Sequence, residues 1–226
     1  RPGNADRSAE KRRSFNQGRH RLIAMIAVID YGMGNIHSVR KALESKGGRV
    51  RVTNSPSDIE RADKLVLPGV GAFGDAMKEL HRRRLDDAIR QHVARGRIFL
   101  GICLGMHLLF ESSRESASAT GLGILKGAVN AFRAERGLKV PHMGWNQIHF
   151  RRQECALFRN IANGSSVYFC HSYFPVPADA GCIAAQTDYG RLFASVIWQG
   201  NVYAMQFHPE KSQAVGLAIM DNFVRL

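Results

Sequence analysis

The stretch RIFLGICLGMHLLF, residues 97–110, joins an apolar run to a segment with helical spacing through Gly101-Ile102-Cys103-Leu104-Gly105. A nucleophile in a G-x-nucleophile-x-G sequence between a strand and a helix is typical of a sharp elbow. The residue at its apex adopts a strained backbone, and glycines at the flanking positions avoid collisions between side chains. Because the N-terminus of the following helix favours a thiolate, we interpret Cys103 as a candidate nucleophile.

Length and composition limit the class of protein. A chain of 226 residues, 45% of them hydrophobic, is large enough for one domain with a full core. Its apolar runs stay far below the ~18 residues of a transmembrane helix, so we expect no membrane partner. The net charge is +13, but no aromatic-rich basic motif accompanies it. We therefore favour solvated basic faces, or steering of an anionic partner, over nucleic-acid binding.

The four cysteines do not follow a disulfide or zinc spacing. Cys155, Cys170 and Cys182 lie in mixed or apolar surroundings and are interpreted as buried thiols. We expect no metal and no cofactor, and free thiols of this kind favour a cytoplasmic location.

The chain divides into a basic segment and one domain. Residues 1–24 hold seven basic and two acidic residues without apolar periodicity. We expect this segment to be a disordered extension or leader, and residues 25–226 to form a single domain.

In the domain, apolar runs first alternate with helical segments. The expected strands are 25–30, 49–53, 64–67 and 97–100, and the expected helices are 36–46, 75–80 and 85–94. This order predicts an α/β fold with a mostly parallel central sheet and helices on both faces. Strand-like runs then follow one another at 127–133, 147–150, 166–171, 182–186, 193–198 and 202–206, before a helix at 214–225. They favour an antiparallel edge or a small second sheet.

A cysteine nucleophile needs a base and a group that orients it. His208-Pro209-Glu210 follows an apolar strand-like run. In an extended segment, residues two apart point the same way, and the proline restricts the backbone of His208. Glu210 could then fix the tautomer of the imidazole. The alternative is a loop histidine beside a surface carboxylate. Combined with the elbow, the motif predicts a triad of Cys103, His208 and Glu210.

An acyl-transfer site also needs donors for an oxyanion. The glycine-rich loop after the strand at 64–67 lies at the edge of the sheet where ligands bind. Gly69, Val70 and Gly71 could turn amides toward an anion, and the Leu104 amide follows the nucleophile. The loop could instead hold phosphate, although it lacks the Lys-Ser/Thr pair of a P-loop, or could be a simple turn.

Six segments resemble a known family. They are IDYGMGNIHSV (29–39), LPGVGAFGDAM (67–77), GICLGMHLLFE (101–111), VPHMGWN (140–146), YFCHSYF (168–174) and YAMQFHPEKS (203–212). Together they resemble the class I, or triad, glutamine amidotransferases, which have a flavodoxin-like fold. Within that family the chain is similar to the glutaminase subunits of imidazole glycerol phosphate synthase.

The resemblance implies a reaction and a partner. Cys103 would attack the side-chain amide of glutamine, His208 would move the proton, and Glu210 would orient His208. Ammonia would pass to a (β/α)8-barrel cyclase subunit in a heterodimer. That subunit makes imidazole glycerol phosphate and aminoimidazole carboxamide ribonucleotide in histidine biosynthesis. The resemblance further implies that the loop at 69–71 is the oxyanion strand.

The resemblance also implies two further sets of residues. His171, Ser172 and Tyr173 would line the glutamine pocket. Asn35, Trp145 and Tyr168 would face the partner. The alternatives are a core role for Trp145 and a half-buried strand position for Tyr168.

One position departs from the family pattern. The family usually has glutamine after G-x-C-L-G-M, where its amide helps to hold the substrate, but this chain has His107. An imidazole could substitute in part, could weaken glutamine binding, or could pack on the elbow helix. The alternatives to an active subunit are a paralogue that feeds a different synthase, and a partner-dependent scaffold with weakened glutaminase activity. A cysteine peptidase is a more distant alternative.

Overall fold

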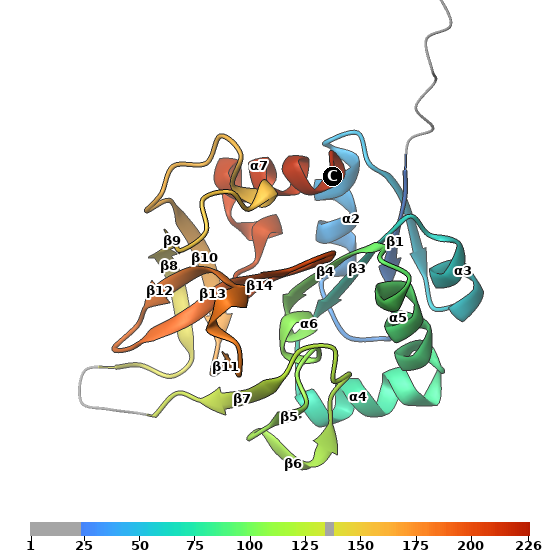
Figure 1. Cartoon of the computed structure of the whole chain (residues 1–226), viewed down its shortest axis with the longest axis horizontal. Helices are drawn as coiled ribbons and strands as arrows, with labels where there is room; N and C mark the ends of the chain where they lie inside the picture. The colour runs from blue at the N-terminus through green and yellow to red at the C-terminus, as the bar shows by residue number, and fades with distance from the viewer. Residues whose placement is uncertain (1–23, 134–137) are drawn as a thin grey trace, which may run out of the picture.

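The computed structural model describes residues 24–133 and 138–226. The expected basic extension lies, apart from its last residue, outside the described residues. The described chain is built around an eight-stranded sheet with the order β2-β1-β3-β4-β14-β13-β12-β9 (Figure 1). Its strands are β1 (Met25–Ile29), β2 (Arg49–Thr53), β3 (Lys64–Gly69), β4 (Ile98–Cys103), β9 (His149–Phe150), β12 (Ile183–Asp188), β13 (Leu192–Gln199) and β14 (Val202–Met205).

The sheet is parallel from β2 to β14 and antiparallel from β14 to β9. Strand β3 is buried along its whole length, and β1 and β4 are buried except at their first residue. This explains their continuous apolar sequences, because a parallel sheet is covered on both faces. The predicted fold class, a mostly parallel sheet with an antiparallel edge, is confirmed.

Helices cover both faces of the sheet (Figure 1). The helices are α2 (Ile36–Glu44), α3 (Pro56–Arg61), α4 (Phe73–Arg82), α5 (Leu85–Ala94), α6 (Leu104–His107) and α7 (Gln213–Val224). Two core clusters lie on opposite faces of the sheet. On one face the sheet packs against α3, α4 and α5, and on the other it packs against α2 and α7. Helix α2 buries Val39, Ala42 and Leu43. This i, i+3, i+4 spacing defines the apolar side of a surface helix.

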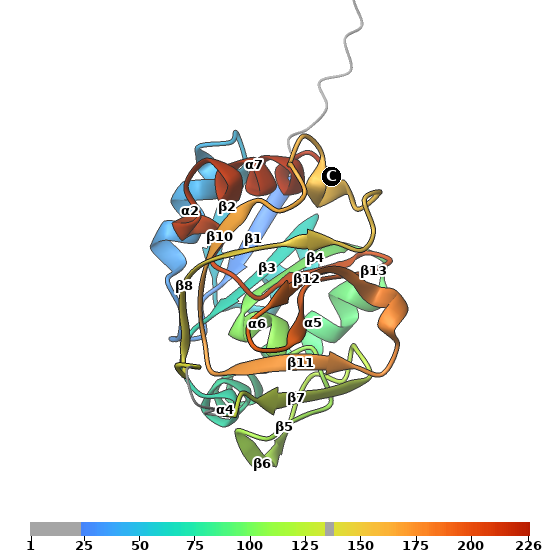
Figure 2. The same cartoon turned by 90° about the vertical axis from the view of Figure 1, so that its left-hand side faces the viewer.

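Two smaller sheets pack beside the large one (Figure 2). One pairs β8 (His142–Gln147) with β10 (Ser166–His171). The other has the order β11-β7-β5-β6, from β5 (Ser112–Ser113), β6 (Ser116–Thr120), β7 (Gly127–Ala131) and β11 (Tyr173–Pro177). Three short 3-10 helices complete the fold: η1 (Ala156–Phe158), η2 (Ala180–Cys182) and η3 (Pro209–Lys211).

The structure corrects some expected elements. The expected strand at 147–150 is in fact the end of β8 followed by the two-residue β9, with Ile148 between them. The expected helix after the elbow ends at His107, because Leu109 and Phe110 then bond to carbonyls three residues back. Helix α3, strands β5, β6 and β11, and residues 142–146 of β8 were not expected.

The buried lysine at the start of β3 contacts the end of the last helix. Lys64 is 4% exposed, and its Nζ donates hydrogen bonds to the carbonyl oxygens of Phe223 (3.1 Å) and Val224 (2.7 Å). A cation at the C-terminal end of a helix is favourable because the last carbonyls lack partners within the helix. The residues near the C-terminus are therefore joined to a central strand.

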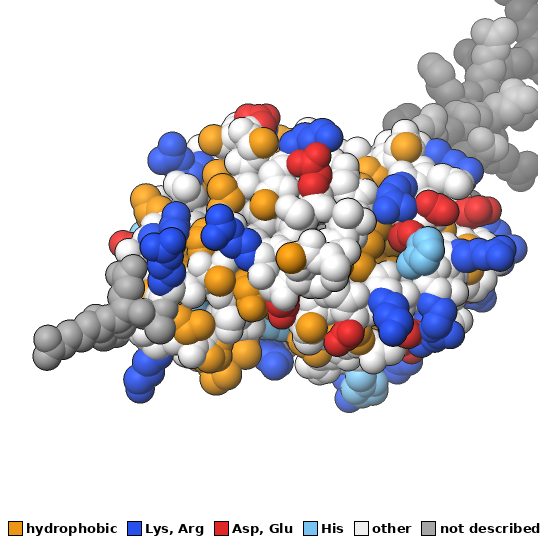
Figure 3. Space-filling model, turned by 90° about the horizontal axis from the view of Figure 1, so that it is seen from below, with side chains coloured by type: hydrophobic (Ala, Val, Ile, Leu, Met, Phe, Trp, Pro, Cys, Tyr) orange, Lys and Arg blue, Asp and Glu red, His pale blue; other side chains and the backbone are white. Residues whose placement is uncertain are grey.

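The surface charges are dispersed on the face that Figure 3 shows. Lys and Arg side chains form separate groups there, with Asp and Glu side chains among them. Across the two described ranges, no helix has the length and apolar character needed to cross a membrane.

Candidate active site

Cys103 forms the apex of a strained turn between β4 and α6. Its φ of 53° and ψ of −110° lie in a region that residues with a side chain rarely adopt. A Cβ atom at Gly105 would lie 1.8 Å from the carbonyl oxygen of Leu67, and one at Gly101 would lie 2.7 Å from the carbonyl oxygen of Gly105. Both glycines are therefore required by close backbone packing around the cysteine.

His208 and Glu210 are in direct contact. The Nδ1 atom of His208 lies 3.0 Å from Oε1 of Glu210, and the two side chains are 4% and 1% exposed. The segment is not extended as expected, because Pro209 begins η3. The carboxylate instead reaches back from the first turn of η3 to the residue before it. The backbone of His208 is fixed by an N–H bond to the Tyr168 carbonyl and by the Ser212 hydroxyl, which donates to the His208 carbonyl.

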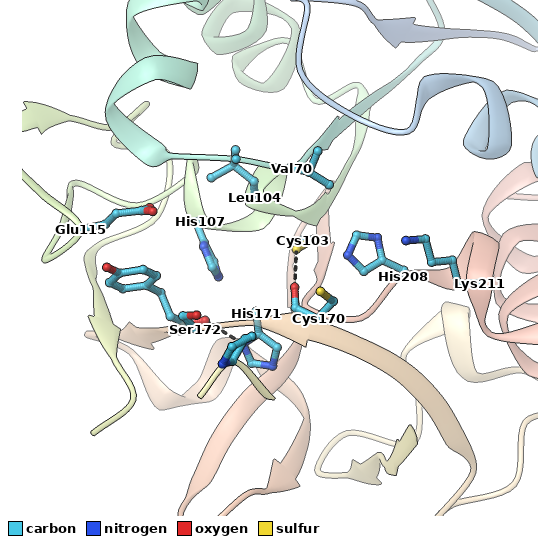
Figure 4. Close-up of a pocket in the computed structure, with 13 residues that line it drawn as sticks. Val70, Cys103, Leu104, His107, Glu115, Cys170, His171, Ser172, His208 and Lys211 are labelled. Atoms are coloured by element: carbon cyan, nitrogen blue, oxygen red, sulfur yellow. Dashed lines mark hydrogen bonds between the residues drawn. The ribbon is translucent and has the colours of Figure 1, made fainter. Parts of the chain in front are cut away.

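The environment of His208 favours its charged form. Burial alone would lower the pKa of His208, but hydrogen bonds with Cys103 and Glu210, and the charges of both groups, raise it to about 10. A protonated imidazole next to the cysteine stabilises a thiolate. Figure 4 shows His208 and His107 on opposite sides of Cys103.

Most of the predicted site residues line one cavity of about 290 Å³. Those that line it are Val70, Gly71, Cys103, Leu104, His107, His171, Ser172, Tyr173 and His208. Gly69 and Glu210 do not line the cavity themselves but are sequence neighbours of residues that do. The predicted partner-facing residues Asn35, Trp145 and Tyr168 are not part of the lining. The cavity is also lined by Glu115, Pro141, Cys170 and Lys211, which the sequence analysis did not assign to the site.

Two of these additional residues can be understood from their surroundings. The Oε2 atom of Glu115 accepts a hydrogen bond of 2.9 Å from the amide of Phe73, at the first residue of α4. Cys170 is half-buried, which corrects the expectation of a buried thiol, and its carbonyl lies 3.9 Å from Sγ of Cys103. Neither residue has a spacing in the sequence that would reveal its place at the site.

The glycine-rich loop begins at the end of β3, beside the nucleophile. Gly69 pairs in register with Cys103 of β4, and Gly71 has a φ of 106°. A Cβ atom at Gly69 would lie 2.3 Å from the hydroxyl oxygen of Tyr31 and 3.0 Å from Cβ of Leu104. The loop backbone thus passes close to the residue after the nucleophile. That its amides serve as oxyanion donors stays a prediction.

Tyr31 is a buried residue beneath this loop that the sequence analysis did not single out. It is 0% exposed, and its hydroxyl has no hydrogen-bond partner among the described residues. Burial, together with the nearby charge of Cys103, raises the pKa of Tyr31 far above its usual value. The only signal in the sequence is a tyrosine two residues after the end of the buried strand β1.

His107 contacts another side chain of the core. Its Nε2 lies 2.7 Å from Oε1 of Gln206, and burial lowers the pKa of His107 to about 4. The other end of the Gln206 amide, Nε2, donates to Sγ of Cys103 over 3.9 Å. His107 is therefore neutral near pH 7. It lines the cavity and belongs to a buried polar chain that ends at the nucleophile.

A pair of buried histidines supports the opposite wall. The Nδ1 atom of His142 lies 2.9 Å from Nε2 of His171, whose Nδ1 lies 2.7 Å from the carbonyl oxygen of Tyr173. Because a carbonyl only accepts, Nδ1 of His171 donates, and the proton between the rings belongs to His142. Burial lowers the pKa of His142 to about 4 and that of His171 well below its usual value. Both rings are neutral near pH 7, so the Tyr173 carbonyl is held by an uncharged hydrogen bond.

The predicted partner-facing residues lie outside the cavity. Trp145 is 50% exposed, which is not a core position, and it pairs in register with the half-buried Tyr168. Their rings meet edge to face, with centroids 6.1 Å apart. The ammonium group of Lys211, which lines the cavity, lies 5.9 Å from the Tyr168 ring. Asn35 precedes α2 and makes no side-chain capping bond.

Metal-binding geometry is not found in the part of the chain that the structure describes. No three His, Cys, Asp or Glu side chains there could together hold a metal ion.

Comparison with known proteins identifies related sequences and folds. Residues 27–226 match the family model of glutamine amidotransferase class-I. The imidazole glycerol phosphate synthase subunit HisH of Syntrophotalea carbinolica is 53% identical over 204 residues, which cover 88% of this chain and 98% of that protein. The same subunit of Aquifex aeolicus is 52% identical over 199 residues, which cover 88% of this chain and 95% of that protein. The structure of PurLQS from Thermotoga maritima has a TM-score of 0.69 at 18% identity, covers 89% of this chain and 96% of that one, and supports the fold alone.

Proposed function

This chain belongs to the class-I glutamine amidotransferase family, and we propose that it hydrolyses glutamine to glutamate and ammonia through a thioester on Cys103. The observation that carries the proposal is the strained cysteine beside a histidine whose pKa is raised to about 10, at one end of a cavity of about 290 Å³. A thiolate next to an imidazolium is an activated nucleophile with its proton donor already in place. We propose the same single domain for residues 25–226, of which the family model covers 27–226.

The proposed reaction has two stages. The thiolate of Cys103 attacks the carboxamide carbon of glutamine, and the oxyanion receives hydrogen bonds from the Leu104 amide and the loop at 69–71. His208 gives its proton to the leaving nitrogen, so ammonia departs and a glutamyl thioester remains. His208 then takes a proton from water, which attacks the thioester and releases glutamate and the thiolate. Glu210 stabilises the charged imidazole in both stages.

The cavity wall supplies groups for the amino-acid end of glutamine. We propose that His171, Ser172 and Tyr173 line that subsite and that His107 contributes to its wall. All four residues line the cavity, and Figure 4 shows His107 and Ser172 on the side of Cys103 away from His208. His171 and its partner His142 are both neutral, so this wall adds no positive charge to the subsite.

The partner follows from the relatives. They are subunits of imidazole glycerol phosphate synthase, and we propose that this chain is the glutaminase subunit of that enzyme. It would pass ammonia to a (β/α)8-barrel cyclase in a heterodimer in histidine biosynthesis. Met143 (61% exposed) and Trp145 (50% exposed) lie two residues apart on β8 and so point to one side of the strand, which supports a protein interface there. The four free cysteines fit a cytoplasmic setting.

The activity is tested by measuring glutamate release with and without the cyclase subunit and its nucleotide ligand. We expect slow hydrolysis alone, sharp acceleration in the complex, and no glutamate from Cys103→Ala. The matched control is Cys182→Ala, because Cys182 is a buried thiol bonded to the Asp179 carbonyl and does not line the cavity. Equal turnover in Cys103→Ala and the unaltered chain would remove Cys103 from the mechanism.

The partner is tested by binding. Trp145→Ala should weaken the complex with the cyclase by at least about 10-fold, as expected for a central aromatic anchor. Trp198→Ala is the control, because Trp198 stacks on Tyr203 within its own chain. Asn35 and Tyr168 are tested by alanine variants in the same assay. Co-purification with a different synthase would instead support the paralogue, and binding without glutaminase activity would support the scaffold.

A further inference from the structure

A buried polar chain connects the nucleophile to α6. His107 in α6, Gln206 just after β14, and Cys103 at the end of β4 come from three elements that meet in the core. The His107 ring is 5% exposed and Gln206 is 0% exposed. The two contacts measure 2.7 Å from His107 Nε2 to Gln206 Oε1 and 3.9 Å from Gln206 Nε2 to Cys103 Sγ.

The chemistry of these atoms sets the direction of each hydrogen bond. An amide oxygen only accepts, so the proton lies on Nε2 of His107 and is donated to Gln206. The amide nitrogen carries two protons and only donates, and the group in front of it is the sulfur of Cys103. Each contact therefore runs from α6 toward the nucleophile.

A glutamine amide can present either end to a neighbour. With its oxygen toward Cys103, the amide would repel a thiolate; with its nitrogen there, it stabilises one. Because the oxygen is the partner of His107, the nitrogen is the end left for the sulfur. The amide at position 206 is thus oriented by the ring at position 107.

We infer that His107 is a positioning residue for Cys103, because its bond to Gln206 keeps an N–H donor directed at the thiolate. The inference rests on the proposed function and deepens it. It gives His107 a role beyond the wall of the glutamine subsite, and it gives Gln206 a direct contact with the nucleophile. Two further ionisable groups interact electrostatically with Cys103, namely His208 and Tyr31. His171 interacts in the same way with both His107 and His208.

The test measures the thiolate directly. Iodoacetamide alkylates Cys103, and mass spectrometry gives the rate constant at that residue from pH 5 to pH 10. In Gln206→Met, which keeps the size but removes the donor, we expect the half-point of the profile to rise by about one pH unit. This corresponds to about tenfold slower alkylation below the half-point. His107→Leu should produce a shift of the same sign, and His107→Gln, which retains an amide donor, should restore most of the wild-type profile.

A matched control separates this effect from general loss of stability. His92 is another buried histidine, and both of its nitrogens contact backbone carbonyls, of Ile59 and Ile98. His92→Gln should lower the melting temperature without moving the alkylation profile. If Gln206→Met does not fold, Gln206→Glu tests the same contact, because a carboxylate of the same shape removes the N–H and should move the half-point further upward.

The outcomes are distinct. Unchanged profiles in folded variants at positions 206 and 107 would overturn the inference while leaving Cys103 as the nucleophile. A wild-type Cys103 that reacts no faster than the buried Cys155 would contradict the proposed function itself. A shift in His107→Leu that His107→Gln reverses would support the positioning role.

Discussion

Glu210 holds His208 through one oxygen only. Its Oε1 atom lies 3.0 Å from Nδ1 of the imidazole, while Oε2 is buried with no hydrogen-bond partner within the described chain. A buried carboxylate with a single partner interacts strongly with the positive charge of that partner. Within the side chain of Glu210, Oε1 alone therefore orients the imidazole, and together with Cys103 this carboxylate favours its charged form.

We first predict the effect of Glu210→Gln on catalysis. Either end of the new amide lacks the negative charge that helps to raise the pKa of His208, and an amide nitrogen at Nδ1 would also move the imidazole proton to the nitrogen that faces Cys103. In both cases proton transfer is weakened, so kcat for glutamine hydrolysis should fall by about 10²–10⁴-fold in the complex. Glu154→Gln, which breaks only an exposed contact with Arg152, is the control. A kcat within about twofold of wild type would show that Glu210 does not orient the base.

The second prediction concerns stability and pH. His208 has a pKa of about 10 in the fold, above the value near 6.5 of an unfolded chain. Its contribution to the free energy of unfolding is therefore fully present below about pH 6.5 and is lost as the pH rises through about 10. Urea unfolding at pH 6, 8 and 10 should show a larger loss of stability in wild type than in His208→Gln. Parallel curves for the two proteins would contradict a raised pKa.

A third prediction follows from the backbone contact of the elbow. In Gly105→Ala the new Cβ would meet the Leu67 carbonyl at 1.8 Å, so β3 and the elbow would have to separate. We expect a loss of at least about 3 kcal/mol in the free energy of unfolding. Gly47→Ala is the control, because its φ is 82° but no atom lies within 4 Å of the added Cβ. That variant should lose only about 1–2 kcal/mol from backbone strain.

The fourth prediction concerns the unpartnered hydroxyl of Tyr31. Removing it in Tyr31→Phe should leave the melting temperature unchanged or raise it, since a buried donor without a partner costs about 1–3 kcal/mol. Gly69→Ala should be destabilising because its Cβ would lie 2.3 Å from the same hydroxyl. The double variant should recover part of that loss, which thermal unfolding of all three proteins would show. A strongly destabilised Tyr31→Phe would mean that the hydroxyl has a partner in solution.

The parallel half of the fold could be predicted because each element has a local signal. Buried strands such as β3 are continuous apolar runs, and the elbow is marked by its glycine spacing. Helix α3 was missed although Pro56 occupies its first position, where proline is favoured. Strand β11 contains Pro175 and Pro177, which argue against a strand in the sequence. It is formed all the same because it lies at the edge of its sheet, where proline is tolerated.

The candidate site divides in a similar way. Cys103, His208 and the loop at 69–71 belong to short motifs whose chemistry is local. Gln206, His142 and Tyr31 were not assigned roles, because each is a polar side chain in an apolar segment. The partners of Gln206 and His142 lie in other elements, and the Tyr31 hydroxyl lies beside Gly69 of β3, so only the order of the strands brings these residues to the site.

The contact between Lys64 and α7 has a practical consequence for anyone who alters the end of the chain. The carbonyls of Phe223 and Val224 receive the ammonium group of the residue that begins β3, and the same strand ends at Gly69 beside the nucleophile. A truncation or a rigid fusion at the C-terminus would disturb these acceptors. We expect such a change to act on β3 and on the loop that follows it, although neither Phe223 nor Val224 lines the cavity, so a tag placed after Val224 needs a flexible spacer.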